Sequence, residues 1–202
     1  ADVREGVAVC GAAGRKCGRT AWGFVTRCVD GRDAAHRGRV RGGGYLVPGC
    51  TGLGARNGDM YARCCIVGRP RGTRREHSIR AAQESIAYQV DDLLTAMERD
   101  TGIPLSTLSV DGGASRDSFL MQFQADISHC TIRRPVIRET TALGACYLAG
   151  LATGVWHSRE ELKQLWRCDT FYEPNMADEI RRQLLAGWSK AVGRSLDWAD
   201  HR

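Results

Sequence analysis

The chain has 202 residues, and its 29 Lys and Arg against 23 Asp and Glu give a formal net charge of +6. This length suits a single α/β core. Because no run of about 18 apolar residues exists, we expect no membrane span. The basic residues carry no recognition-helix, RNP-like or Cys/His finger pattern, so we expect no nucleic-acid partner. Arginines that bunch at 69–75 and 133–138 are expected to be solvated.

The nine cysteines include no C-x-x-C pair, although Cys64 and Cys65 are adjacent. No charged start followed by an apolar segment indicates a secretory signal at the beginning of the chain. An odd cysteine number without such a signal is typical of reduced intracellular thiols. We therefore expect a cytoplasmic protein without disulfides and without a metal site of its own.

Residues 1–44 show little regular patterning. They contain ten glycines and eight arginines, with no sustained helical or strand periodicity. The stretch Gly14–Arg19 is a poor helix, because each of its two glycines costs about 1 kcal/mol relative to alanine.

From residue 44 onward, strand and helix patterns alternate. The expected elements are strands at 45–47 and 63–67, a helix opened by a Thr73/Glu76 capping box and ended by Gly102, a strand at 108–110, a helix through 119–127, extended segments at 130–132 and 135–137, a helix at 139–152, a second capping box at Ser158 and Glu161, and a helix at 180–196. Such alternation predicts an α/β layered domain. Its helices should turn inward the apolar residues at helical spacing: Ile79, Ala82, Ile86, Val90, Leu93, Met97, Leu184, Trp188 and Val192.

The most informative stretch is Leu108–Phe123, in which a short strand runs into Asp111-Gly112-Gly113 and then into an amphipathic helix. That helix should bury one face, made of Phe119, Leu120, Phe123 and Ile127. Paired glycines permit a positive φ and a close approach of a ligand to the backbone. A helix start just beyond them offers N–H groups to an anion. Alone, the same pattern also fits an ordinary tight β–α turn.

Short motifs that follow one another in a single order place this turn in a wider context. They are Tyr45-Leu46-Val47-Pro48, Thr51-Gly52-Leu53-Gly54-Ala55, Asp59–Arg63, Arg71–His77, Glu84–Gln89, Val110–Asp126, Arg134–Val136, Glu139–Ala145, Tyr147–Ala152, Glu173-Pro174, Ala186-Gly187-Trp188 and Lys190–Val192. Together they resemble the C-terminal, nucleotide-binding domain of glycerol kinases, in the FGGY family of carbohydrate kinases. The resemblance covers residues 44–202 and implies one lobe of an actin-like, ribonuclease H-like ATPase fold.

The resemblance also implies a nucleotide site in a cleft between two lobes, of which this chain represents the second. Gly113, with Gly112 shaping the turn, would lie against the nucleotide. Asp117 stands where the family has an asparagine that contacts the adenosine portion. The aspartate lacks amide donors and adds negative charge, so we expect weaker nucleotide binding unless Arg116 offsets it. Two readings stay open for Asp111: it either stabilises the start of the following helix or contacts the nucleotide directly.

The chain departs from the family pattern in two other places. Residues 55–59 read Ala-Arg-Asn-Gly-Asp where the family has Ala-Pro-Tyr-Trp-Asp, so we expect a looser loop. The family's Gly-x-x-x-Gln pair beside the nucleotide would fall on Ala12 and Lys16, or on Gly11 and Arg15, and neither alignment restores it. We therefore interpret residues 1–43 as a degraded or frame-disturbed remnant of the strand and helix that precede the domain.

By resemblance, the activity is ATP-dependent phosphorylation of glycerol to glycerol 3-phosphate, with ATP and Mg²⁺ as cofactors. The catalytic base and the glycerol-holding residues belong to the N-terminal lobe, so no catalytic residue and no metal ligand is expected in this chain. The isolated chain should be inactive, and the full-length proteins of the family should form homo-oligomers. Two alternatives stay open: another FGGY sugar kinase, or a non-catalytic degraded fragment.

Overall fold

The computed structural model describes residues 42–54, 57–137, 139–165 and 167–201. The interpretation of residues 1–43, including the positions 11, 12, 15 and 16, therefore lies almost wholly outside the described residues. Ala55 and Arg56 lie outside them too. Within the described ranges, no helix has the length and apolar composition needed to cross a membrane.

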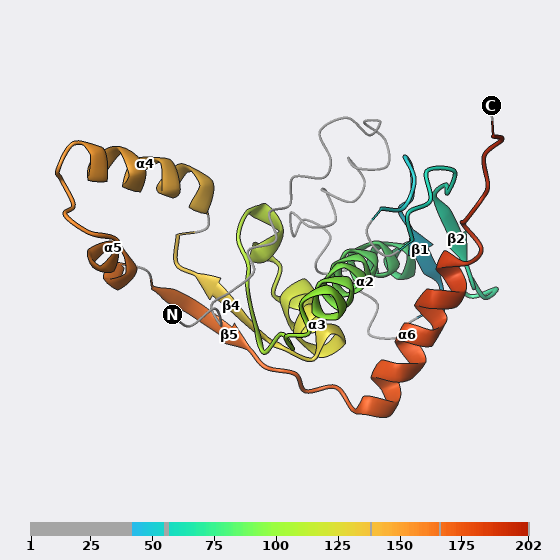
Figure 1. Cartoon of the computed structure of the whole chain (residues 1–202). Helices are drawn as coiled ribbons and strands as arrows, with labels where there is room; N and C mark the ends of the chain where they lie inside the picture. The colour runs from blue at the N-terminus through green and yellow to red at the C-terminus, as the bar shows by residue number, and fades with distance from the viewer. Residues whose placement is uncertain (1–41, 55–56, 138, 166, 202) are drawn as a thin grey trace.

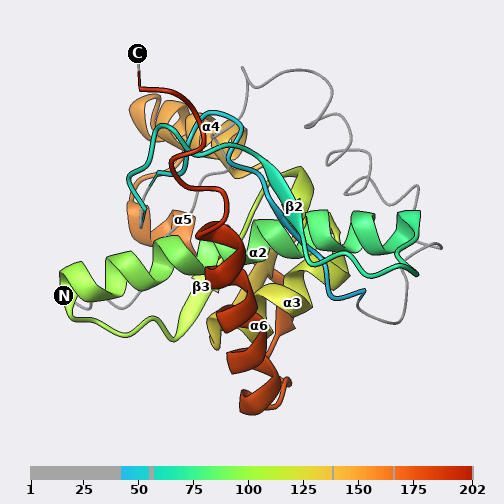
Figure 2. The ribbon, with the colours of Figure 1, turned by 90° about the vertical axis from the view of Figure 1, so that its right-hand side faces the viewer.

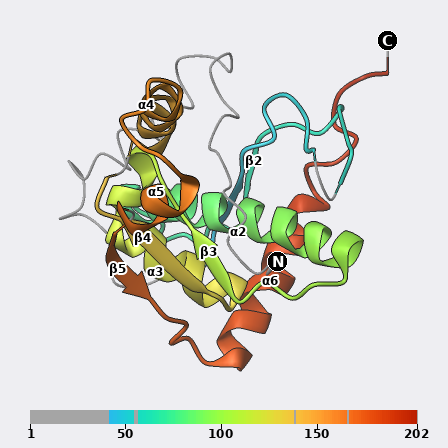
Figure 3. The same cartoon turned by 60° about the vertical axis from the view of Figure 1, so that its left-hand side comes forward.

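Five short strands form two separate sheets. In the first sheet, β1 (Tyr45–Val47) pairs with β2 (Cys65–Val67) in antiparallel register. The second sheet has the order β3 (Thr107–Ser109), β4 (Thr131–Pro135), β5 (Cys168–Tyr172), in which β3 runs parallel and β5 antiparallel to β4 (Figure 3). The extended structure expected at 130–132 and 135–137 is confirmed as β4, which spans Thr131–Pro135 and ends before residues 136 and 137.

Helices α2 (Arg75–Thr101) and α3 (Ser118–Ser128) lie between the two sheets, and α6 (Asp178–Val192) crosses α2 on the side of the first sheet (Figures 1 and 2). Helices α4 (Thr140–Ala152) and α5 (Arg159–Leu165) project on the opposite side, beyond β4 and β5 (Figure 1). Gly102 ends α2 with a φ of 67°, as its position in the sequence predicts. The alternation of strands and helices is confirmed.

The expected capping box of Thr73 and Glu76 is wrong. The Thr73 hydroxyl donates to the Pro70 carbonyl at 2.7 Å, and α2 begins at Arg75 instead. The N–H of Arg74 donates to Nδ1 of His77 at 2.9 Å, so a histidine takes the place expected for the glutamate.

Of the two hydrogen bonds in the expected capping box of Ser158 and Glu161, one is confirmed. Glu161 donates its N–H to Oγ of Ser158 at 3.2 Å. The Glu161 carboxylate, however, accepts the N–H of His157 at 2.9 Å, one residue before the cap.

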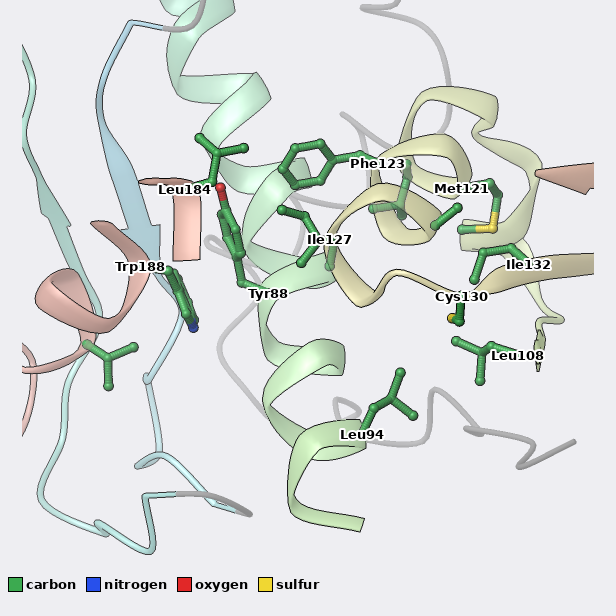
Figure 4. Close-up of a cluster of buried hydrophobic side chains, with 14 of the residues drawn as sticks. Tyr88, Leu94, Leu108, Met121, Phe123, Ile127, Cys130, Ile132, Leu184 and Trp188 are labelled. Atoms are coloured by element: carbon green, nitrogen blue, oxygen red, sulfur yellow. The ribbon is translucent and has the colours of Figure 1, made fainter. Parts of the chain in front are cut away.

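The core is centred on the ring of Tyr88, on α2 (Figure 4). It stacks on Trp188 of α6 with ring centroids 5.0 Å apart, and it meets Phe123 of α3 edge-on at 5.6 Å. The Trp188 N–H donates to a carboxylate oxygen of Asp92 at 2.8 Å, so the buried indole keeps its polar group satisfied. These aromatic contacts tie three helices together and hold α3 in place behind the β3 turn.

The buried helix faces follow the apolar spacing closely in α3 and α6. Leu120, Phe123 and Ile127 are buried, with Phe119 half-buried beside them. In α6, the buried residues include all three that the spacing predicts: Leu184, Trp188 and Val192.

Candidate functional site

The turn after β3 has a conformation that only glycine adopts readily. Gly112 has a φ of 76° and a ψ of −175°, and Gly113–Arg116 then form a 3₁₀ turn, η2. The α-helix α3 begins only at Ser118. The expectation that an α-helix starts directly behind the paired glycines is therefore wrong, and a 3₁₀ turn occupies that position.

As far as the described residues go, the outer side of this turn is open. Apart from the adjoining backbone, no described atom lies within 4 Å of the position that a Cβ would take at Gly112 or at Gly113. Among the described residues, the N–H groups of Gly112, Gly113 and Ala114 have no protein acceptor. Consecutive backbone N–H groups without protein partners form a concavity suited to an anion. The backbone here can thus be approached closely by a ligand.

Asp117 follows the glycines in the chain, but its carboxylate points into the protein and is only 4% exposed. One oxygen accepts the N–H groups of Phe119 and Leu120, at 2.9 and 3.3 Å, which caps α3. The other oxygen accepts the Gln83 amide of α2 at 2.6 Å. The negative charge therefore sits at the positive end of a helix.

Two buried polar residues support the turn from inside. The Ser115 hydroxyl donates to the Gly112 carbonyl at 2.7 Å, and Nη1 of Arg134 donates to the Ser115 carbonyl at 3.4 Å. Arg134 also forms an ion pair with Asp169 of β5, with Nη2 and the carboxylate oxygen 3.0 Å apart. The turn is thereby connected to the middle and edge strands of the second sheet.

The expectation that the arginines at 133–138 are solvated is wrong for Arg134, which is 9% exposed. Side chains alternate along a strand, so Arg134 shares the inward face of β4 with Ile132. That two-residue spacing could have revealed its burial. Gln83 could have been found in the same way, because it lies four residues after the buried Ile79 on α2.

Asp111 connects the end of β3 to the start of α4. Its carboxylate accepts a hydrogen bond from the hydroxyl of Thr140, the first residue of that helix. Asp111 and Gly112 are half-buried, whereas Gly113 and Ala114 are exposed. The open turn therefore lies where three elements meet: β3, η2 and the beginning of α4.

The glycine-rich loop at the other end of the domain is held by Asp59. Its carboxylate accepts the N–H groups of Tyr61 (2.7 Å), Ala62 (3.0 Å) and Asp197 (2.7 Å). These backbone hydrogen bonds, that of Asp197 foremost, hold the pKa of Asp59 below its ordinary value. Backbone bonds in both directions between Leu53 and Asp59, at 2.7 and 2.8 Å, close the loop. Backbone hydrogen bonds thus join the two ends of the loop.

Comparison with known proteins bears directly on this arrangement. Residues 16–153 match the sequence model of the FGGY family of carbohydrate kinases, C-terminal domain. A glycerol kinase of Caldanaerobacter subterraneus subsp. tengcongensis is 58% identical over 158 residues, which are 78% of this chain and 32% of that protein. A glycerol kinase of Clostridium beijerinckii is 52% identical over 177 residues, 88% of this chain and 36% of that protein. The chain spans about a third of the length of these relatives.

Solved structures agree with the sequence matches. The crystal structure of Plasmodium falciparum glycerol kinase with ADP superposes with a TM-score of 0.75 at 33% identity, over 87% of this chain and 36% of that one. A xylulose kinase of Lactobacillus acidophilus shares the fold, with a TM-score of 0.61 at 22% identity, over 85% of this chain and 35% of that one. The expected α/β fold, one lobe of the actin-like, ribonuclease H-like class, is confirmed. The chain belongs to the FGGY family of carbohydrate kinases and matches that family's C-terminal domain.

Proposed function

We propose that this chain is the nucleotide-binding part of an ATP-dependent glycerol kinase, with the turn at Gly112 and Gly113 as the place where the nucleotide meets the backbone. The observation that carries the proposal is the open turn, in which three consecutive N–H groups have no acceptor among the described residues. A phosphate or ribose oxygen can accept such N–H groups without displacing a side chain.

Glycerol as the acceptor is supported by the relatives that are 52% and 58% identical, both of which are glycerol kinases. The xylulose kinase structure at 22% identity supports only the fold. Acceptor choice, the catalytic base and any homo-oligomer are assigned by this proposal to the remainder of the full-length protein. The alternative is that the full-length protein is another FGGY sugar kinase, with a sugar as the acceptor in place of glycerol.

Asp117 is part of the proposed site through the backbone that it holds. Its carboxylate already accepts hydrogen bonds from Phe119, Leu120 and Gln83. We therefore expect it to fix the end of the turn rather than to contact the nucleotide with its side chain. Arg116 is exposed on the same turn and can offset the negative charge.

Mg²⁺ is the metal that phosphoryl transfer from ATP requires. Among the described residues, no group of three or more His, Cys, Asp or Glu side chains could hold a metal ion. The side chains of the described residues therefore do not by themselves form a metal site. We assign the ion to the nucleotide phosphates and to the other lobe, and derive no step from it.

Titration calorimetry with ADP tests the proposal on the purified chain. Gly113→Ala places a methyl group on the open side of the turn, where the ligand would lie, and should weaken ADP binding by about tenfold or more. Gly72→Ala is the matched control, because the same change there also meets no atom within 4 Å and lies outside the site. It should leave the ADP affinity unchanged.

The absence of a binding signal at millimolar ADP would contradict a functional lobe in isolation and favour the non-catalytic fragment. Equal affinities for the wild-type chain and Gly113→Ala would contradict the location of the site. Glycerol-dependent ADP release after co-expression with the N-terminal part of the Clostridium beijerinckii relative would test the acceptor, with xylulose as the competing substrate.

A further inference from the structure

A chain of polar contacts runs from the second sheet to the open turn. It begins at β5, where Asp169 and the Thr170 hydroxyl accept hydrogen bonds from Arg134 at 3.1 and 2.9 Å. Arg134 donates a hydrogen bond to the Ser115 carbonyl, and the Ser115 hydroxyl donates one to the Gly112 carbonyl. Ser115 is 1% exposed, so both of its polar groups are held inside the protein.

The geometry of the peptide unit gives these contacts a consequence for the turn. In a trans peptide, the C=O of one residue and the N–H of the next point in opposite directions. Because Ser115 draws the Gly112 carbonyl inward, the N–H of Gly113 is turned outward. The Ser115 carbonyl is held inward in the same way, by Nη1 of Arg134.

We propose that Arg134 and Ser115 are positioning residues for the nucleotide, which hold the peptide groups of the turn so that the N–H of Gly113 faces the ligand. The inference rests on the proposed function and adds the residues that orient its site. Neither side chain touches the nucleotide. Both act through carbonyl groups on the inner side of the turn.

The burial of Arg134 supports a role in geometry. Removing a guanidinium from water is costly, and an apolar side chain inside a sheet is often at least as stabilising. Asp169, Thr170 and the Tyr172 ring, whose centroid lies 5.5 Å from the guanidinium carbon, offset that cost. What an apolar side chain could not provide is the hydrogen bond to the Ser115 carbonyl.

Two variants interrupt the chain of contacts, and each has a matched control. Arg134→Met keeps the length of the side chain and removes its donors, whereas Asp169→Asn weakens the ion pair of the same arginine and leaves its bond to Ser115 in place. Ser115→Ala removes the hydroxyl that holds Gly112, whereas Ser118→Ala removes a nearby hydroxyl that accepts from Tyr172. The readouts are the ADP dissociation constant by calorimetry, the melting temperature, and hydrogen exchange of peptides that cover residues 110–117.

We expect about tenfold weaker ADP binding in Arg134→Met and in Ser115→Ala, because each removes a hydrogen bond that holds a carbonyl of the turn inward. In Ser115→Ala the Gly112 carbonyl keeps the longer bond from the Ser115 N–H, at 3.3 Å. Both should exchange faster at residues 112–117. Asp169→Asn should lower the melting temperature but keep the ADP affinity within about twofold of wild type. Ser118→Ala should change neither the melting temperature nor, beyond about twofold, the ADP affinity.

Affinity losses that follow melting temperature across all four variants would overturn the positioning role, since they would reflect general destabilisation. If Arg134→Met does not fold, Ser115→Ala and Ser118→Ala decide the matter. If the wild-type chain binds no ADP, the proposed function fails on its own, and hydrogen exchange still decides the inference. Unchanged exchange at residues 112–117 in Ser115→Ala would then overturn it.

Discussion

Replacing Gly112 by alanine should destabilise the chain through the backbone alone. Its φ of 76° and ψ of −175° lie in a region that is essentially restricted to glycine. Because no described atom lies within 4 Å of the new Cβ, steric contact adds nothing. The strain is about 1–3 kcal/mol, and for a chain of this size each kcal/mol lowers the melting temperature by about 2–4 °C.

Gly113→Ala serves as the matched control for this prediction. Gly113 has no positive φ and is equally open, so alanine should leave stability unchanged or raise it by about 0.4–1 kcal/mol by restricting the unfolded chain. Thermal unfolding without nucleotide, followed by circular dichroism, measures both variants. Equal melting temperatures for Gly112→Ala and Gly113→Ala would refute the assigned backbone conformation of the turn.

Two further predictions concern the core. Trp188→Phe keeps the stacking on Tyr88 and loses the hydrogen bond to Asp92, so urea unfolding should show the free energy of unfolding lowered by about 1–2 kcal/mol. Trp188→Ala also loses the stacking and should lower it by about 3–5 kcal/mol. Equal losses in the two variants would contradict separate contributions from the stacking and the hydrogen bond. Burial, followed by the charges of Asp91 and Glu98, raises the pKa of the Cys130 thiol from 9.0 to about 11. Below pH 9 the thiol is neutral in the folded and the unfolded chain, and its contribution to stability is fully present. That contribution is lost as the pH rises from 9 toward 11, because the unfolded chain then gives up the proton more readily. Melting temperatures should therefore fall less steeply between pH 9 and 11 in Cys130→Ala, and parallel curves would contradict the shift.

Helical spacing predicts a buried face best where a helix packs against one neighbour. In α6, Leu184, Trp188 and Val192 are all buried, as expected. Helix α2 contacts both α3 and β1, and it buries more than one stripe. Of its expected residues, only Ile79 and Ala82 are buried, and the half-buried ones are Ile86, Val90, Leu93 and Met97. Its buried positions include polar residues instead, because two packing surfaces share the helix.

The position of the turn could be predicted from the sequence, but its internal structure could not. Paired glycines after a short strand indicate a close approach of the backbone. A 3₁₀ turn precedes α3, and Asp117, which caps α3, has its second oxygen held by Gln83 of α2. Contacts between residues 34 positions apart leave no local pattern.

The bond between the N–H of Asp197 and the Asp59 carboxylate joins residues that are 138 positions apart. Nearby, Ala199 donates its N–H to the Tyr61 carbonyl at 3.0 Å, and Ser195 accepts the Arg63 N–H at 3.1 Å. Contacts of such long range form late, because closing a long loop of chain costs entropy before they can form. During synthesis on the ribosome, residues 59–63, which lead into β2, can therefore acquire these partners only after residues 195–199 have emerged. Removing residues 195–199 would leave this segment without the three bonds.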